Sequence, residues 1–220
     1  ITLSYLGNLN ITDSAPGSIT ATILQKLLDK TGGMVVVDNA IEVTGNSRDT
    51  AKALKDGSLT ANTVTVKLSD DHKLQELIDI NKKTKGEITL HNASIELEGS
   101  TAQLMDALDG TITGGYTGNL KISDGVSDIQ ATDLSTVAGK TTGSITVSNA
   151  INIKGSATEV AAAMTESKFT ATKATVELSD AAHDLTQLKQ INDATNGAIT
   201  IHADRKAIAL EGSTADIKAA

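Results

Sequence analysis

The sequence contains no cysteine and no tryptophan, and Pro16 is its single proline in 220 residues. Without cysteine the chain has no disulfide, no thiolate nucleophile and no cysteine-bound zinc. Large rings are also scarce, because Tyr5, Tyr116 and Phe169 are the only Phe or Tyr residues. Compact cores of this size normally bury more aromatic area. The scarcity favours a thin core of Val, Ile, Leu, Ala and Thr, in which each layer is buried only by its neighbours.

Positive charge is the second shortage. The chain has 19 Lys and Arg against 27 Asp and Glu, which gives a net charge of −8. Nucleic-acid binding and docking on anionic lipid both need a basic face, so neither partner is expected. No apolar run approaches the ~20 residues that cross a bilayer, and we predict no membrane insertion. The chain opens on Ile1 without Met or a signal peptide and stops inside a helical pattern at Ala220, so we expect an excerpt or a processed protein.

What the sequence does contain is a tandem duplication. Four motifs recur in the same order in its two halves: Y-x-G-N-L at 5–9 and 116–120, L-S-D at 68–70 and 178–180, I-N at 80–81 and 191–192, and L-E-G-S-T-A at 97–102 and 210–215. Chance does not give so many ordered matches. We predict a first copy at 1–115 and a second at 116–220, each of two units, stacked as one continuous solenoid. Two globular domains with a hinge near Gly114-Gly115 are the alternative.

Each copy divides again. Four glycines recur at nearly even spacing, at Gly45, Gly99, Gly155 and Gly212. They mark four units of about 55 residues, each long enough for two coils of a solenoid. A slot for Asp or Asn recurs twice in each unit, at Asp13, Asn39, Asp70, Asn92, Asp124, Asn149, Asp180 and Asp204. The two periods predict about eight coils averaging roughly 27 residues, which is within the range of solenoid repeats.

Each coil reads as strand, turn, strand and helix. Ile145 and Val147 alternate with polar residues, as expected of a strand. The Asx-Ala or Asx-Gly dipeptide that follows is typical of a turn. A hydroxyl after each of the four glycines is predicted to cap a helix, at Ser47, Ser100, Ser156 and Ser213. Apolar residues then recur at helical spacing, as at Leu104 and Leu108, Val160 and Met164, or Ile19, Ile23 and Leu27.

Helix stops and overall size complete the predicted coil. Glycine after a polar residue is a fair helix stop, as at Thr31-Gly32, Lys85-Gly86 and Asn196-Gly197. Helices and strands this short are unstable alone and need neighbouring coils. The predicted fold is therefore an α/β repeat solenoid, with short strands stacked into a sheet face and short helices on another face. At ~4.8 Å per layer the eight coils would extend on the order of 40 Å.

The recurrent aspartates are the best candidate ligands for a metal. Asp-rich turns bind calcium through oxygen, and the candidates are Asp70, Asp71, Asp124, Asp128 and Asp180. The alternative, which we favour, is a ladder of turn residues that satisfies the backbone. Asn replaces Asp in alternate coils, and the calcium-binding nonapeptide motif that begins G-G-x-G-x-D does not occur in the sequence. We expect no other cofactor.

No set of residues specific to catalysis is evident. The histidines are paired by the duplication, His72 with His183 and His91 with His202, and no metal-ligand spacing joins them to carboxylates. The basic run at Lys82-Lys83 and Lys85 fits a solvated helix end. The segment 113–116 is glycine-rich but lacks the Lys-Ser/Thr of a phosphate loop. We therefore predict that the protein is not an enzyme.

The motifs Ser123-Asp124-Gly125 and Ser148-Asn149-Ala150, each followed by a helical pattern, resemble repeats in very large secreted surface proteins of bacteria, notably cyanobacteria. They also resemble repeats in structural appendages of phages. The resemblance covers essentially the whole chain, and such families carry no catalytic residues to transfer. It implies a structural or assembly module of an extracellular surface layer, filament, adhesin or virion appendage, which self-assembles through the solenoid ends. A glycan- or calcium-binding module of a secreted protein is the alternative function.

Overall fold

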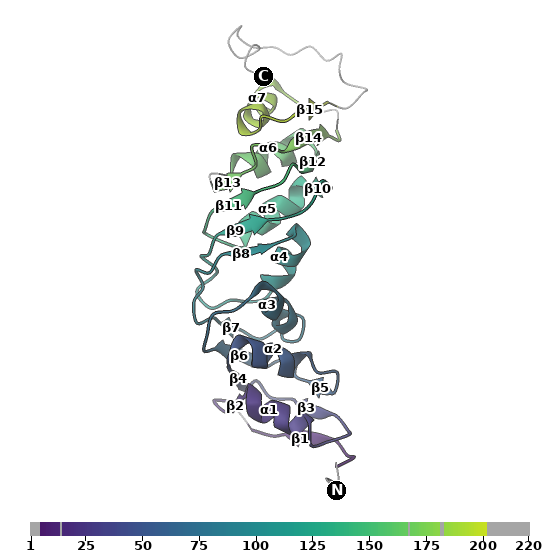
Figure 1. Cartoon of the computed structure of the whole chain (residues 1–220), viewed down its shortest axis with the longest axis vertical. Helices are drawn as coiled ribbons and strands as arrows, with labels where there is room; N and C mark the ends of the chain where they lie inside the picture. The colour runs from purple at the N-terminus through teal and green to yellow at the C-terminus, as the bar shows by residue number, and fades with distance from the viewer. Residues whose placement is uncertain (1–4, 14, 167, 181–182, 202–220) are drawn as a thin grey trace. The chain divides into compact units, whose positions relative to one another are not determined.

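The computed structural model describes residues 5–13, 15–166, 168–180 and 183–201. These residues form an α/β structure of seven helices and four small sheets, in which every strand pair is parallel (Figure 1). The helices are α1 (Ala21–Leu28), α2 (Ser47–Lys55), α3 (Leu74–Asn81), α4 (Thr101–Ala107), α5 (Ala131–Gly139), α6 (Ala157–Thr165) and α7 (Leu185–Ala194). The predicted α/β class is confirmed.

The chain divides into two compact units. The first consists of Ile1–Ile95 and Met105–Thr117, and the second of Glu96–Leu104 and Gly118–Ala220. The predicted boundary between copies, at 115 and 116, lies close to the junction at 117 and 118. The location of this junction does not test whether the copies form one continuous solenoid, which stays a prediction.

Two sheets form the first unit. One has the order β1-β3-β5 and the other the order β2-β4-β6-β7. Their strands are β1 (Leu9–Ile11), β2 (Ser18–Thr20), β3 (Val35–Val37), β4 (Glu42–Gly45), β5 (Leu59–Thr60), β6 (Thr65–Leu68) and β7 (Ile88–Thr89). Leu9 lies opposite Val35, and Val35 lies opposite Leu59. From β1 to β6 the strands of the two sheets alternate along the chain, and β7 then pairs with β6 in the same sheet.

Two sheets also form the second unit, with the orders β8-β9-β11-β13 and β10-β12-β14-β15. Their strands are β8 (Leu97–Gly99), β9 (Leu120–Ile122), β10 (Asp128–Gln130), β11 (Ile145–Val147), β12 (Asn152–Gly155), β13 (Phe169–Thr170), β14 (Thr175–Leu178) and β15 (Ile199–Thr200). Leu97 lies opposite Leu120, and Leu120 opposite Ile145. In both units, neighbouring strands thus come from successive stretches of the chain, each of which returns to the same sheet. We call each such stretch a pass.

The apolar core lies between the helices and the two sheets of each unit. α1 packs on α2 and α2 on α3, while α5 packs on α6 and α6 on α7 (Figure 1). α2 contacts β4 in one sheet and β5 in the other, and α6 likewise contacts strands of both sheets of its unit. Val43, Leu54, Ile153 and Val160 are fully buried there. Because the elements are short, they depend on this packing for stability.

The hydroxyl pattern located the starts of two helices, α4 and α6. Ser156 caps α6 by accepting a hydrogen bond from the Glu159 N–H, and Ser100 accepts one from the Gln103 N–H at 3.2 Å. Both predicted caps are confirmed. Ser213 lies outside the described residues.

The predicted cap at Ser47 was wrong. Ser47 is the first residue of α2, and Asn46 caps that helix by accepting a hydrogen bond from the Asp49 N–H at 2.7 Å. Asn is at least as good a cap as Ser, so the hydroxyl pattern alone misplaces this start.

The predicted apolar face of the first helix was also wrong. Ile19 belongs to β2, and α1 begins after it at Ala21. The buried side of α1 is formed by Ala21, Leu24 and Leu28. Ile23 and Leu27 lie on another side, where Ile23 is 50% exposed. α1 therefore carries two apolar faces, and only one of them is covered.

No helix among the described residues is long and apolar enough to cross a membrane.

Candidate functional site

Three of the predicted calcium ligands hold helix starts. One carboxylate oxygen of Asp70 accepts a hydrogen bond from the Ser47 N–H at 2.6 Å. Asp124 accepts from the N–H of Thr101 at 2.6 Å, and Asp180 from the N–H of Ala157 at 3.1 Å. In each case the donor is the first residue of a helix, 23 positions earlier in the chain. A carboxylate is favourable at this helix end, since the first N–H groups have no partner within the helix.

The other two candidates lie in different surroundings. The backbone carbonyl of Asp71 lies 3.3 Å from the hydroxyl oxygen of Ser47, which makes a shorter contact of 2.8 Å with the carboxylate of Glu76. Asp128 is exposed on β10, where it pairs with Lys154 at 2.9 Å and accepts a hydrogen bond from Asn152 at 2.8 Å. The hydrogen bonds from Asn152 and Lys154 lower the pKa of Asp128. Within the described residues, no group of three or more His, Cys, Asp or Glu side chains is placed to hold a metal ion.

The alternating Asn positions form a second kind of link. The side-chain amide of Asn39 donates to the Asp13 carbonyl at 2.8 Å, and Asn149 donates to the Asp124 carbonyl at the same distance. Each bond joins turns of successive passes, 26 and 25 positions apart respectively. The Asx positions that were identified as one slot in the sequence therefore split into two roles. Asn39 and Asn149 donate to a turn carbonyl, and Asp70, Asp124 and Asp180 accept from a helix start. Asn92 fits neither role, because its side-chain oxygen accepts from the N–H and hydroxyl of Ser94.

A third link was missed in the sequence. A threonine after α1, α3, α5 and α7 donates its hydroxyl to a backbone carbonyl of the preceding pass and accepts the N–H of a glycine two residues on. The threonines are Thr31, Thr84, Thr141 and Thr195, and the carbonyls belong to Gly7, Val64, Gly118 and Ala174. The signal was present as a recurrent T-x-G, at 31–33, 84–86, 141–143 and 195–197.

These glycines allow close approach of two backbone segments. A Cβ atom added to Gly86 would lie 2.1 Å from the carbonyl oxygen of Val64, and one added to Gly197 would lie 2.1 Å from that of Ala174. Both glycines lie beyond the ends of α3 and α7. They were predicted as helix stops. Their geometric role is different: because glycine has no side chain, the facing backbone carbonyl can come close to its Cα atom.

His72 is a buried titratable group in the first unit. It is 3% exposed, and its ring meets that of Tyr116 edge to face, with centroids 5.9 Å apart. The Tyr116 hydroxyl donates to the Ile95 carbonyl and lies 3.4 Å from His72 Nε2. Burial lowers the pKa of His72, against the opposing effect of nearby carboxylates such as Asp71. A ring enclosed in this way has no access to a substrate.

The other histidines do not join His72. His91 is exposed, His183 is half-buried, and His202 lies outside the described residues. The structure therefore brings none of the predicted histidine positions together into a site among the residues it describes.

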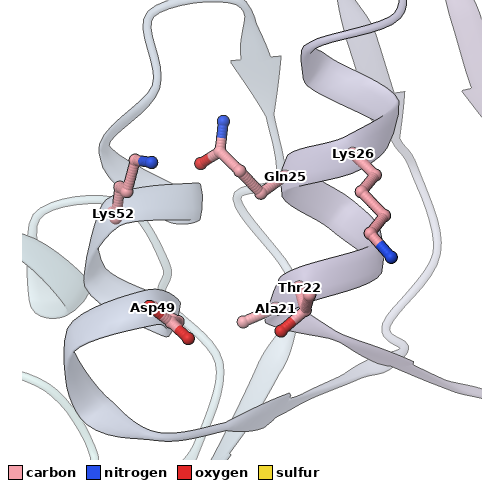
Figure 2. A pocket seen from close by; sticks show the side chains of 6 residues that line it. All are labelled: Ala21, Thr22, Gln25, Lys26, Asp49 and Lys52. Atoms are coloured by element: carbon pink, nitrogen blue, oxygen red, sulfur yellow. The ribbon is translucent and has the colours of Figure 1, made fainter.

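A small polar cavity lies between α1 and α2 (Figure 2). Its volume is about 160 Å³, and its lining includes Gln25, Lys26, Asp49 and Lys52. Gln25 donates to Asp29 at 3.1 Å, and Asp49 accepts from the Asn46 amide at 2.8 Å. Ligand pockets are typically ~300–1,000 Å³ and are mostly apolar. This cavity is smaller, and two of its polar side chains are already engaged locally.

A larger groove lies on β1, β2 and the uncovered face of α1, with a volume of about 470 Å³. We call it the N-terminal groove. Its apolar lining is Ile11, Ile19, Ile23 and Leu27, and its polar lining includes Asn10 and Asp13. Among the described strands, β1 and β2 are each the outer strand of their sheet. The groove thus combines an uncovered apolar surface with two strand edges, which is a surface suited to adding another chain segment.

The second unit shows what the matching surface looks like when it is covered. The motif at 116–120 repeats the motif at 5–9, so β9 is the counterpart of β1. Unlike β1 on that side, β9 pairs with a described strand, β8. Leu120 and Ile122 on β9 are buried, whereas their counterparts Leu9 and Ile11 on β1 are only half-buried. Tyr5 in the first copy is likewise 58% exposed. The N-terminal groove is therefore open where the second unit is closed.

Comparison of the chain with protein-family models, curated proteins and solved structures gives no match.

Proposed function

We propose that the chain is an α/β repeat solenoid and acts as a structural or assembly module of an extracellular surface layer, filament, adhesin or virion appendage. Its work in this proposal is mechanical. Successive passes hold one another in place, and copies join through the ends of the solenoid. No catalytic step is part of the proposal.

The observation that carries the proposal is the register of the strands. In all four sheets each strand pairs in parallel with a strand about two dozen positions away, as expected when each pass of the chain lies on the previous one. The nearly constant spacing supports a solenoid. Its passes are somewhat shorter than the roughly 27 residues that the sequence periods predict.

Polar links between passes support a mechanical role. Asp side chains reach the helix start of the preceding pass, and Thr side chains reach its backbone carbonyls. Lys154 on β12 pairs with Asp128 on β10 and Glu177 on β14, at 2.9 and 3.0 Å. One lysine thus bridges three neighbouring strands. Bonds of this kind resist separation of the passes, which is the property that a spacer or filament requires.

Electron microscopy of the purified chain tests the proposal, with and without millimolar calcium. End-to-end filaments or sheets in both conditions are the expected result. Isolated particles in both conditions would contradict the assembly role. Filaments that form only with calcium would keep the assembly role and restore Asp70, Asp124 and Asp180 as metal ligands. Particles that stay isolated but gain thermal stability from calcium would favour the binding-module function, because a ligand that binds only the folded state stabilises it.

A further inference from the structure

We infer that the N-terminal groove binds the segment Leu210–Ala215 of a second copy of this chain, which adds as a strand to the edge of β1 that has no neighbour among the described strands. The inference rests on the proposed assembly function and specifies which residues meet. Leu210–Ala215 lies outside the described residues.

The internal pairing of β8 with β9 supplies the template. β8 belongs to the motif L-E-G-S-T-A at 97–102, which returns at 210–215. β9 begins at the last residue of the motif Y-x-G-N-L at 116–120, just as β1 begins at the last residue of 5–9. Within one chain, Leu97 lies opposite Leu120 and Gly99 opposite Ile122. The same register between copies places Leu210 opposite Leu9 and Gly212 opposite Ile11.

Polar groups in the groove match this occupant. Asp124 accepts hydrogen bonds from the backbone N–H and the hydroxyl of Thr101. Their counterparts are Asp13, which lines the groove, and Thr214. Within the described part of the chain, no group donates a hydrogen bond to the Asp13 carboxylate. In the inferred contact Asp13 accepts from Thr214 of the second copy, just as Asp124 accepts from Thr101.

Tyr5 gives a second match. Its counterpart Tyr116 is 3% exposed, and the Tyr116 hydroxyl donates to the carbonyl of Ile95, two residues before Leu97. The corresponding residue two positions before Leu210 is Ile208, so the second copy offers a carbonyl on the same type of residue as Ile95. Docking of the second copy covers the exposed Tyr5 ring and gives its hydroxyl the equivalent acceptor. Apolar and polar complementarity therefore both point to this chain's own C-terminal sequence.

Disulfide trapping tests the register, and the absence of cysteine from the chain removes any background. Glu98 and Lys121 are Cα partners in the β8–β9 pair, and their counterparts are Glu211 and Asn10. Asn10 is exposed, so Asn10→Cys should leave the fold intact. Two preparations, one with Asn10→Cys and one with Glu211→Cys, are mixed under mild oxidation. The expected product is a heterodimer whose cross-linked peptides join positions 10 and 211.

Matched variants control for chance contact. Ser213→Cys in place of Glu211→Cys moves the thiol two residues along the strand, which puts the Cα atoms beyond the ~7 Å limit for a disulfide. It should give several-fold less heterodimer. Glu98→Cys combined with Lys121→Cys in one chain should form an internal disulfide, which shows that this pair geometry permits one.

Removal of the Asp13 carboxylate tests the polar contact separately. Asp13→Ala should lower the heterodimer yield several-fold, because Thr214 of the second copy loses its acceptor. Asp38→Ala removes an equal charge at another exposed position and should leave the yield unchanged. Equal yields from the two variants would overturn the role of Asp13 in the contact.

The outcomes separate this inference from the proposed function. Heterodimers linked between 10 and 211 support it. Filaments by electron microscopy without that link would overturn the inferred register and leave the assembly function standing. A chain carrying both Asn10→Cys and Glu211→Cys that closes on itself at all concentrations would overturn the inference, because the occupant of the groove would be the chain's own end. Absence of both filaments and cross-links would contradict both proposals.

Discussion

Thr101 donates two hydrogen bonds to one carboxylate oxygen of Asp124, from its backbone N–H at 2.6 Å and from its hydroxyl at 2.8 Å. The two residues are 23 positions apart and belong to successive passes of the second unit. Asp70 and Asp180 bond to helix starts in the same way, with the N–H groups of Ser47 and Ala157 as donors. In each case an aspartate side chain thus caps the N-terminus of a helix in the preceding pass.

Replacing Asp124 tests the strength of this link. Asp124→Ala should lower the free energy of unfolding by about 1–2 kcal/mol, because a capping oxygen is lost and two donors on Thr101 lose their acceptor. Urea unfolding followed by circular dichroism measures the change. Asp128→Ala is the control, since the ion pairs of that exposed carboxylate are screened by solvent. An equal loss in both variants would mean that charge, and not the bond to Thr101, matters.

Replacing Thr84 should lower the stability of the protein more than the loss of one hydroxyl group suggests. Its hydroxyl is buried and joins the Val64 carbonyl to the Gly86 N–H. Thr84→Val keeps the shape but leaves both groups without that partner, at a cost of about 1–3 kcal/mol. Thermal unfolding should show a clear fall in Tm. Thr146→Val, at an exposed position on β11, should change Tm little. Similar Tm values for the two variants would refute the structural role of T-x-G.

Gly86 tests the close approach of two backbone segments. Gly86→Ala would place a Cβ 2.1 Å from the Val64 carbonyl oxygen, and a backbone atom has little room to move. We expect a loss of about 1–3 kcal/mol or more, as for other overpacked sites. Gly57 has no atom within 4 Å of an added Cβ, so Gly57→Ala should be neutral or slightly stabilising. The result that counts against the account is equal stability of the two variants.

His72 should make stability depend on pH. Burial lowers its pKa below the ordinary 6.5, so the unfolded chain takes up a proton at a higher pH than the folded chain does. The contribution to stability is complete above pH 6.5 and is lost as the pH falls through the lower folded pKa. His72→Gln should therefore flatten the dependence of urea-unfolding stability on pH below neutrality. His91→Gln, at an exposed position, should retain the wild-type slope. Identical slopes in all three proteins would rule out this role.

The sequence predicts the local elements better than their partners. Alternation identified β11 and the hydroxyl pattern identified the start of α6, because these signals depend on residues close in the chain. The slot at Asp124 and Asn149 was also visible as a period. The sequence did not show which atoms these side chains bind. Those atoms lie 23 to 25 positions away in the chain, and the strand register decides which of them come within reach.

The error in the apolar face of the first helix has a physical origin. Helical spacing favoured a single face through Ile19, Ile23 and Leu27, but α1 begins after Ile19, and Leu24 faces the core instead. A periodic pattern locates an apolar face without saying whether that face is covered. Burial in the structure was needed to separate the two faces of α1 and to define the N-terminal groove.

The most direct test of the central claim is sedimentation equilibrium of the unmodified chain from micromolar to millimolar concentration, at a salt concentration that screens its net charge of −8. The account predicts an average mass that starts near 22.7 kDa and rises continuously with concentration, because each added copy exposes a new N-terminal groove. Asp13→Ala should shift this rise to higher concentration. A mass that stays at 22.7 kDa throughout, or that stops at a closed dimer, would contradict end-to-end assembly.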